Sequence, residues 1–298
     1  MAENYPFEKR VPVTVIGGYL GAGKTTLVNH LLRNARGRRL AIMVNDFGEL
    51  PIDADLIEAE DDDVISLTGG CVCCSYGNDL IMAMMEMAKM DPVPDHIILE
   101  CSGVALPGAI VNSLSLLDGY SVDGVVVLAD AETIEERIVD KYMADTIINQ
   151  LEDADIILLN KTDLILPDKR ANVVNTLKKI SDDAAVVGTV NSAISPEIIL
   201  QDFEHSSRQT TTPFVHAKHK SKVTELKLSD SIEPEEYCRN LLRSNPDIVR
   251  IKGFARNMEG AMKTIQVVGK RINISHASND HKAGLVVISV EAGPEELR

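Results

Sequence analysis

Apolar and polar positions follow two alternating patterns along the first two thirds of the chain. Short runs rich in Val, Ile and Leu, typical of buried strands, are separated by stretches in which apolar residues recur every three or four positions, as on one face of a helix. This alternation predicts an α/β fold, a mostly parallel sheet with helices on both faces. The predicted strands are 11–17, 39–45, 63–67, 96–101, 123–129, 154–160 and 184–190. The predicted helices are 24–35, 78–90, 106–117, 131–151, 168–180 and 195–202.

The pattern changes after residue 203, where a polar, threonine-rich stretch has no periodicity. Such a stretch is typical of a linker between domains. Beyond it, strand-like runs begin at Val223, Ile248, Thr264, Ile272 and Leu285. One helix is predicted among them, from Glu233 to Arg243. We therefore predict a first domain over 1–205, a linker over 206–222 and a small α+β domain over 223–298.

Composition and charge narrow the classes of function. The 298 residues carry a formal net charge of −15 without a basic stripe, which argues against nucleic acid or anionic membranes as main partners. No apolar run approaches the ~18 residues of a membrane span, and the first residues lack the basic and apolar regions of a signal peptide. Five cysteines, three of them close together, favour a reducing cytoplasm over a disulfide framework.

A glycine-rich turn joins the first predicted strand to the first predicted helix. From Gly18 to Thr25 it reads G-x-x-x-x-G-K-T, in which glycines let backbone N–H groups converge on a polyphosphate at a helix N-terminus. Lys24 is expected to reach the β- and γ-phosphates, and the Thr25 hydroxyl to ligate Mg²⁺. The predicted phosphate-binding residues are Gly18, Gly21, Ala22, Gly23, Lys24, Thr25 and Thr26. The sequence thus predicts a nucleoside triphosphate site.

A later predicted strand, 154–160, has the apolar run 156–159 and continues into the pattern N-K-x-D. An aspartate at its last position can accept hydrogen bonds from both N1–H and the exocyclic amine of guanine, a pair that adenine cannot donate. Hydrogen bonds to charged groups contribute ~1.5–3 kcal/mol each, so the pair would separate GTP from ATP by about 3–6 kcal/mol. Asn160, Lys161 and Asp163 are therefore predicted to bind guanine, and Asn191 is a further candidate for a backbone contact.

The apolar run 96–99 ends in an acid, Glu100, followed by Cys-Ser-Gly. A carboxylate at the end of such a strand would orient water on Mg²⁺, in the manner of a Walker B acid. Ser102 and Gly103, which come next, are expected to sense the γ-phosphate. The alternative for Glu100 is an incidental carboxylate at the end of a strand.

Three of the five cysteines stand at i, i+2 and i+3 in Gly-Gly-Cys-Val-Cys-Cys. Thiolates at Cys71, Cys73 and Cys74 can converge on one soft cation, with Zn²⁺ the first choice and Co²⁺ or Cu⁺ alternatives. Simple packing of small buried thiols and a disulfide between Cys71 and Cys74 are the other interpretations. The following helix carries five methionines, for which core packing is favoured over a soft-metal relay. These are Met82, Met84, Met85, Met87 and Met90.

The ordered set GGYLGAGKTT, NDFGELPID, GGCVCC, ECSG and NKTD resembles the CobW-type GTPases, a family of metallochaperones and metal-enzyme activators. The resemblance implies a P-loop GTPase domain with a smaller C-terminal domain, a Walker B acid at Glu100 and a metal site at Cys71, Cys73 and Cys74. It extends to the stretch 251–254 of the second domain, so it covers most of the chain.

The resemblance further implies a cytoplasmic GTP-gated carrier that hydrolyses GTP slowly and delivers Zn²⁺ or Co²⁺ to a client metalloprotein. Its predicted catalytic residues are Lys24, Glu100, Asp46 and Glu49. Asp46 and Glu49 belong to a switch segment that γ-phosphate and Mg²⁺ would order, and Glu49 is also a candidate ligand of the carried metal. A homodimer is left open.

Three other functions are left open as well. The chain could be a P-loop enzyme or chelatase-associated factor of cofactor biosynthesis, a nucleotide-regulated metal buffer without a client, or a protein with a structural zinc site.

Overall fold

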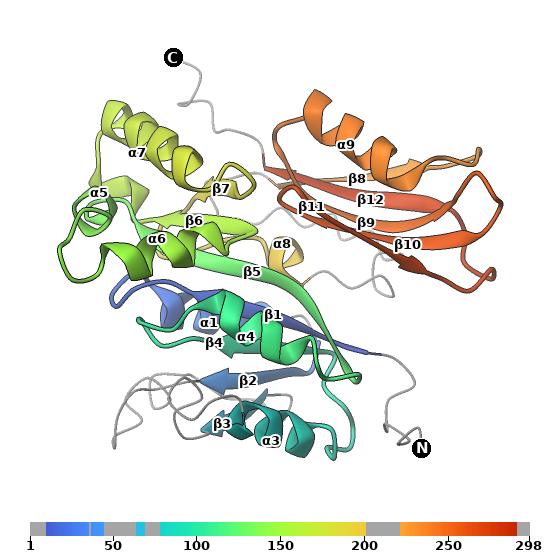
Figure 1. Cartoon of the computed structure of the whole chain (residues 1–298), viewed down its shortest axis with the longest axis horizontal. Helices are drawn as coiled ribbons and strands as arrows, with labels where there is room; N and C mark the ends of the chain where they lie inside the picture. Colours follow the sequence, from blue (N-terminus) through green and yellow to red (C-terminus); the bar gives the residue numbers. More distant parts are fainter. Residues whose placement is uncertain (1–9, 36, 45–63, 69–77, 201–220, 291–298) are drawn as a thin grey trace.

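The computed structural model describes residues 10–35, 37–44, 64–68, 78–200 and 221–290 (Figure 1). Its first sheet has seven strands in the order β3-β2-β4-β1-β5-β6-β7, and every described strand pair in it is parallel. The strands are β1 (Val11–Gly17), β2 (Leu40–Val44), β3 (Val64–Thr68), β4 (His96–Glu100), β5 (Tyr120–Asp130), β6 (Ile156–Asn160) and β7 (Ala185–Gly188). The predicted α/β fold class is confirmed.

The central strands of this sheet are buried on both faces. All five residues of β2, β4 and β6 are inaccessible to solvent or nearly so, which is why these strands read as continuous apolar runs without polar alternation. Val13, Ile42, Ile98 and Leu158 have no exposed surface at all. The core therefore lies on both sides of the sheet, and helices cover both faces (Figure 1).

The helices of this part agree with the predicted ones except in one place. They are α1 (Lys24–Arg33), α3 (Asn78–Met87), α4 (Pro107–Leu114), α5 (Ile134–Arg137), α6 (Ala144–Glu152), α7 (Pro167–Ile180) and α8 (Pro196–Leu200). The single helix predicted over 131–151 is wrong. The Asp140 carboxylate accepts hydrogen bonds from the backbone N–H groups of Tyr142 and Met143, at 2.8 and 3.0 Å, and this local turn separates α5 from α6.

The methionines of α3 divide between core and surface. Met84 and Met87 are fully buried and Met90 packs partly against the core, as core packing predicts. Met82 and Met85 are instead 58% and 48% exposed. Within the described part of the chain, no helix is long and apolar enough to cross a bilayer.

A second sheet, of five antiparallel strands, follows in the order β11-β10-β9-β12-β8. The elements are β8 (Ser221–Lys227), α9 (Pro234–Ser244), β9 (Ile248–Arg256), β10 (Met262–Val268), β11 (Arg271–His276) and β12 (Gly284–Val290). Figure 1 shows α9 lying across one face of this sheet, over a separate core that includes Cys238, Ile251, Ile265 and Leu285. Except for its last two residues, the predicted linker 206–222 lies outside the described residues.

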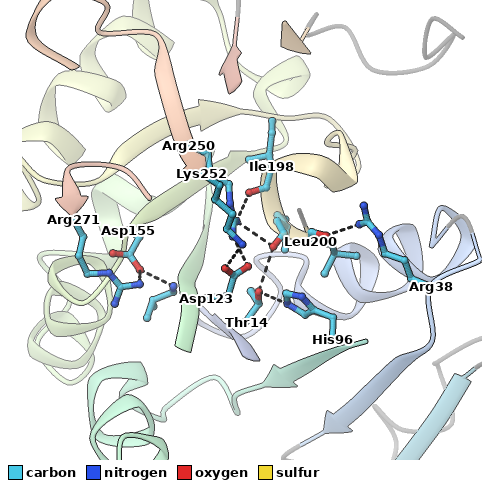
Figure 2. A network of polar contacts seen from close by, with 12 residues as sticks. Thr14, Arg38, His96, Asp123, Asp155, Ile198, Leu200, Arg250, Lys252 and Arg271 are labelled. Carbon is cyan, nitrogen blue, oxygen red and sulfur yellow. Dashed lines mark hydrogen bonds and ion pairs between the residues drawn. The ribbon is translucent and has the colours of Figure 1, made fainter. Parts of the chain in front are cut away.

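Buried ion pairs join the two sheets (Figure 2). Asp123, near the start of β5, accepts hydrogen bonds from Arg250 and from Lys252, the latter at 2.6 Å, and all three side chains are at least 96% buried. Arg250 also donates to the carbonyl oxygens of Ile198 and Ile199 in α8, at 2.7 and 3.2 Å. Arg250 of the second sheet thus contacts both β5 and α8 of the first part of the chain.

A second contact lies beside it, at the start of β6. Arg271 pairs with Asp155 at 2.8 Å (Figure 2). The turn between β10 and β11 comes so close that a Cβ on Gly269 would lie 2.9 Å from the carbonyl oxygen of Asp183. Burial raises the pKa of Asp155 to about 6, although Arg271 and the N–H of Val125 act in the opposite direction.

Candidate nucleotide site

Four strands of the parallel sheet end in the predicted motifs or beside them. β1 ends at Gly17, β4 at Glu100, β5 at Asp130 and β6 at Asn160. Because parallel strands point the same way, their carboxyl ends meet at one edge of the sheet, where ligands of open α/β folds bind. The fold therefore gathers residues that are far apart in the sequence.

The phosphate-binding loop requires glycine at two positions, because the backbone there has a positive φ and neighbouring atoms leave no room for a Cβ. Gly18 has φ of +124°, and a Cβ there would lie 3.0 Å from the backbone nitrogen of Leu128 and closer still to its carbonyl oxygen. Gly23 has φ of +109°, and a Cβ there would lie 2.7 Å from Ser192 Oγ. Both conformations are ones that residues with side chains rarely adopt. The phosphate-binding loop is therefore packed closely against β5, at Leu128, and against the loop that contains Ser192.

The two residues predicted to act on phosphate and Mg²⁺ follow at the start of α1. Lys24 is 8% exposed, and its ammonium group donates to the Tyr19 carbonyl oxygen at 3.4 Å. The Thr25 hydroxyl donates to Glu100 Oε1 at 3.1 Å, and Glu100 is 2% exposed. A hydroxyl and a carboxylate side by side form an all-oxygen donor set, which is the chemistry that Mg²⁺ prefers. These residues fit the predicted metal-nucleotide site.

The loop after β4 lies directly against the phosphate-binding loop. A Cβ on Gly103 would lie 2.9 Å from the backbone nitrogen of Leu20, so only glycine allows this approach. The Gln150 amide donates to the carbonyl oxygens of Gly103 and Ala105, at 3.1 and 2.8 Å. Ser102, the residue before, is 9% exposed. The predicted γ-phosphate sensor is thus held in place from α6.

Asn160 connects the predicted base-binding loops with the phosphate-binding loop. Its amide donates to the Ala22 carbonyl oxygen at 3.0 Å, and its Oδ1 accepts from the Ser192 backbone N–H at 2.8 Å. The Ser192 hydroxyl donates to the Gly23 carbonyl oxygen at 3.0 Å. Asn191 and Ser192 adopt left-handed backbone angles, with φ of +53° and +52°. The buried Asn160 therefore links the two loops, and its predicted contact with guanine stays a prediction.

Asp163 is exposed, in a short 3₁₀ helix over Thr162–Leu164. This leaves its carboxylate accessible to a base from solvent. The preceding Lys161 has φ of +61°, and its ammonium group pairs with Asp130 Oδ2 at 2.6 Å. Thr26, the last predicted phosphate-binding residue, is also exposed at the surface.

Sequence reasoning missed four residues that hold the site together, namely Tyr19, Asp130, Gln150 and Ser192. Asp130 ends an apolar strand just as Glu100 does, and that signal was present in the sequence. Tyr19 occupies a variable position of the phosphate-loop pattern, and most of its partners are backbone atoms, so no residue pattern reveals it.

The predicted metal-cargo residues cannot be placed in this geometry. Asp46, Glu49, Cys71, Cys73 and Cys74 lie outside the described residues. Among the residues that are described, no group of three or more His, Cys, Asp or Glu side chains could hold a metal ion.

The fold and this edge define a P-loop nucleotide-binding protein with a guanine-type base loop. The family model described as "CobW/HypB/UreG, nucleotide-binding domain" matches residues 12–188. The chain therefore belongs to the CobW/HypB/UreG family, as a CobW-type P-loop GTPase, and the predicted resemblance is confirmed.

Individual relatives and a solved structure agree with this assignment. A zinc chaperone CobW from a Sinorhizobium species is 31% identical, over 89% of this chain and 87% of the relative. A zinc-regulated GTPase metalloprotein activator 1 from Dictyostelium discoideum is 30% identical over 67% of this chain, which spans about half (51%) of that relative. The crystal structure of a Zn(II)-bound triple mutant of the YjiA GTPase has a TM-score of 0.50 and 23% identity, and covers 97% of this chain and 96% of its own. At this identity the likeness supports the fold alone.

Proposed function

We propose that this protein is a metallochaperone that binds Zn²⁺ at Cys71, Cys73 and Cys74 under the control of GTP and delivers it to a client metalloprotein. The names of two relatives support it, a zinc chaperone and a zinc-regulated metalloprotein activator. Co²⁺ is the alternative cargo. A cytoplasmic location and a homodimer stay predictions.

The register of the sheet is the observation that carries the proposal. Glu100, the last residue of β4, lies beside Val44 of β2, and Val44 lies beside Thr68 of β3. Two strand spacings of ~4.8 Å separate Glu100 from Thr68 by about 10 Å. Cys71 follows Thr68 by three residues, a length of chain that spans at most ~10 Å. The described end of β3, three residues before the cysteine motif, thus lies about 10 Å from the acid predicted to orient water on Mg²⁺.

The chemistry at the nucleotide end follows from the donors described above. Thr25 and Glu100 would hold Mg²⁺, which when bound supplies positive charge to the β- and γ-phosphates. Lys24 would exchange its contact with the Tyr19 carbonyl oxygen for the phosphates, and the N–H groups of α1 would face the same charge. Asp163 would accept two hydrogen bonds from guanine.

Asp46 and Glu49 follow β2 directly and are proposed to act as the switch segment. β2 ends beside Glu100, so a change at the γ-phosphate can reach this segment and the cysteine motif from one place. Ligand linkage then requires that GTP tighten Zn²⁺ binding by the factor with which Zn²⁺ tightens GTP binding, ~5–150-fold for a coupling of ~1–3 kcal/mol.

A Zn²⁺ titration with GDP and with a non-hydrolysable GTP analogue tests the proposal. We expect tighter binding with the analogue, and loss of that binding in Cys73→Ala. Cys238→Ala is the matched control, since burial raises the pKa of the Cys238 thiol to about 11 and keeps it from acting as a ligand. Equal Zn²⁺ affinity in both nucleotide states would refute gating and leave a structural zinc site.

A further inference from the structure

One ion pair connects the base-binding loop to the strand beside the phosphate-binding loop. Lys161 Nζ lies 2.6 Å from Asp130 Oδ2, and the Asp130 side chain is only 8% exposed. Asp130 Oδ1 is engaged as well, because it accepts the Glu132 backbone N–H at 2.9 Å. The carboxylate is therefore fixed at both oxygens, and it fixes the lysine that precedes the 3₁₀ helix of Asp163.

The backbone of the same residue holds the phosphate-binding loop. The Asp130 N–H donates to the Tyr19 hydroxyl at 2.8 Å, and this hydroxyl also lies 3.3 Å from the Asp130 carbonyl oxygen and 3.2 Å from Thr133 Oγ1. Tyr19 is 4% exposed, and its own carbonyl oxygen accepts from Lys24. Asp130 thus meets the phosphate end of the site with its backbone and the base end with its carboxylate.

We propose that Asp130 is a positioning residue that couples guanine recognition to the phosphate-binding loop. Its carboxylate acts through Lys161, and its backbone acts through Tyr19. The inference rests on the assignment of Asp163 to guanine. Lys161 is held in a left-handed backbone conformation two residues before Asp163, so its anchor sets where the Asp163 carboxylate stands relative to the phosphates. Asp130 itself touches neither base nor phosphate in this role.

A second set of contacts, made by Thr162, keeps the base-binding loop folded when the Lys161–Asp130 ion pair is lost. The Thr162 backbone N–H and hydroxyl both bond to the Thr189 carbonyl oxygen, at 3.2 and 3.1 Å. Removing the charge of Asp130 therefore leaves the loop in place and loosens only its orientation. The expected defect is one of selectivity between bases.

Asp130→Asn tests this with GDP and inosine diphosphate, which lacks the 2-amino group of guanine. We expect GDP affinity to fall by roughly tenfold, the factor that 1.4 kcal/mol corresponds to. The affinity for inosine diphosphate falls less, so the preference for GDP shrinks. Asp140→Asn is the matched control, because Asp140 makes the same bond to the N–H two residues on, at 2.8 Å, but pairs with no cation among the residues that the structure describes. It should leave both affinities unchanged.

The outcomes separate this inference from the guanine assignment. Equal affinity of the unmodified protein for the two nucleotides would refute the role of Asp163, and with it the inference. A normal preference for GDP that Asp130→Asn leaves unchanged, or equal losses for both nucleotides, would overturn the inference alone.

Tyr19→Phe provides a second measurement that does not depend on the first variant folding. It removes one hydroxyl and should weaken GDP and inosine diphosphate by the same factor, since it loosens the phosphate end. In the double variant the losses in GDP affinity should be less than multiplicative, because both changes cut one chain of contacts. Multiplicative losses would mean two independent anchors and would overturn the coupling.

Discussion

The buried ion pairs of Asp123 set the strongest prediction about stability. Asp123→Ala removes the carboxylate that faces Arg250 and Lys252, whose side chains are 1% and 4% exposed. Burial alone would raise the pKa of Asp123, but the two cations outweigh it and hold this pKa well below its usual range. Asp123 is therefore ionised throughout the range in which the protein is handled, and the variant leaves two buried positive charges behind.

The size of the effect follows from that geometry. Breaking a buried ion pair by removing one partner costs ~3–5 kcal/mol, because the remaining charge stays desolvated. Arg250 keeps its bonds to the Ile198 and Ile199 carbonyl oxygens, at 2.7 and 3.2 Å, which retains part of its stabilisation. We therefore expect a loss of about 3 kcal/mol in the free energy of unfolding, the low end of that range.

Urea unfolding at pH 7.5, followed by circular dichroism, measures this loss. Asp182→Ala is the matched control, because Asp182 also pairs with a cation of the second sheet, Lys270 at 3.1 Å, but is 87% exposed. Exposed pairs contribute ~0–1 kcal/mol, so the control should unfold almost as the parent does. A loss below 1 kcal/mol in Asp123→Ala, or equal losses in both variants, would refute the reasoning.

Three further predictions concern pH and the nucleotide site. The pKa of Asp155 is about 6 in the folded protein against an ordinary 3.8, so its contribution to stability is complete only below the ordinary pKa and is lost as pH rises through 6. Urea unfolding from pH 4.5 to 7.5 should show a decrease of roughly 2 kcal/mol relative to Asp155→Asn, and parallel curves would contradict it. Gly18→Ala should weaken GDP binding about 100-fold by fluorescence titration, because its Cβ meets the Leu128 backbone, whereas Gly21→Ala, with φ of +83° and no atom within 4 Å, should weaken it much less. Thr25→Ala should reduce Mg²⁺-dependent phosphate release from GTP at least tenfold, the factor for ~1.4 kcal/mol, and keep Mg²⁺-independent GDP binding. Phosphate release that is unchanged across a Mg²⁺ titration would count against the role of Thr25.

The strands could be predicted because burial on both faces leaves no choice of residue type. β4 and β6 are apolar up to the residue that carries the motif, so both the strand and its functional end can be read from the sequence. The wrong prediction of one helix over 131–151 also has a physical cause. Asp140 bonds to the two N–H groups that would continue a helix, and a periodicity argument does not weigh one side chain against a whole pattern.

Part of the nucleotide site could be predicted because its residues follow strands that are themselves easy to predict. Lys24, Glu100 and Asn160 are brought together because each stands at or just beyond the carboxyl end of a parallel strand. The supporting contacts could not be predicted, since Tyr19 and Gln150 act mainly on backbone atoms that any residue could supply. The same holds for the junction of the two sheets.

β5 connects the junction of the two sheets to the nucleotide site. Asp123, near its start, carries the ion pairs to the second sheet, and Asp130, at its end, carries Lys161 and Tyr19. Seven residues at ~3.3 Å each place the backbones of the two residues roughly 23 Å apart, along a strand that is almost wholly buried between β1 and β6. A strand held so tightly cannot shift at one end without moving its neighbours. Through the described contacts, the second sheet is therefore attached to the same rigid element that orders the nucleotide loops, at the opposite edge of the sheet from the nucleotide.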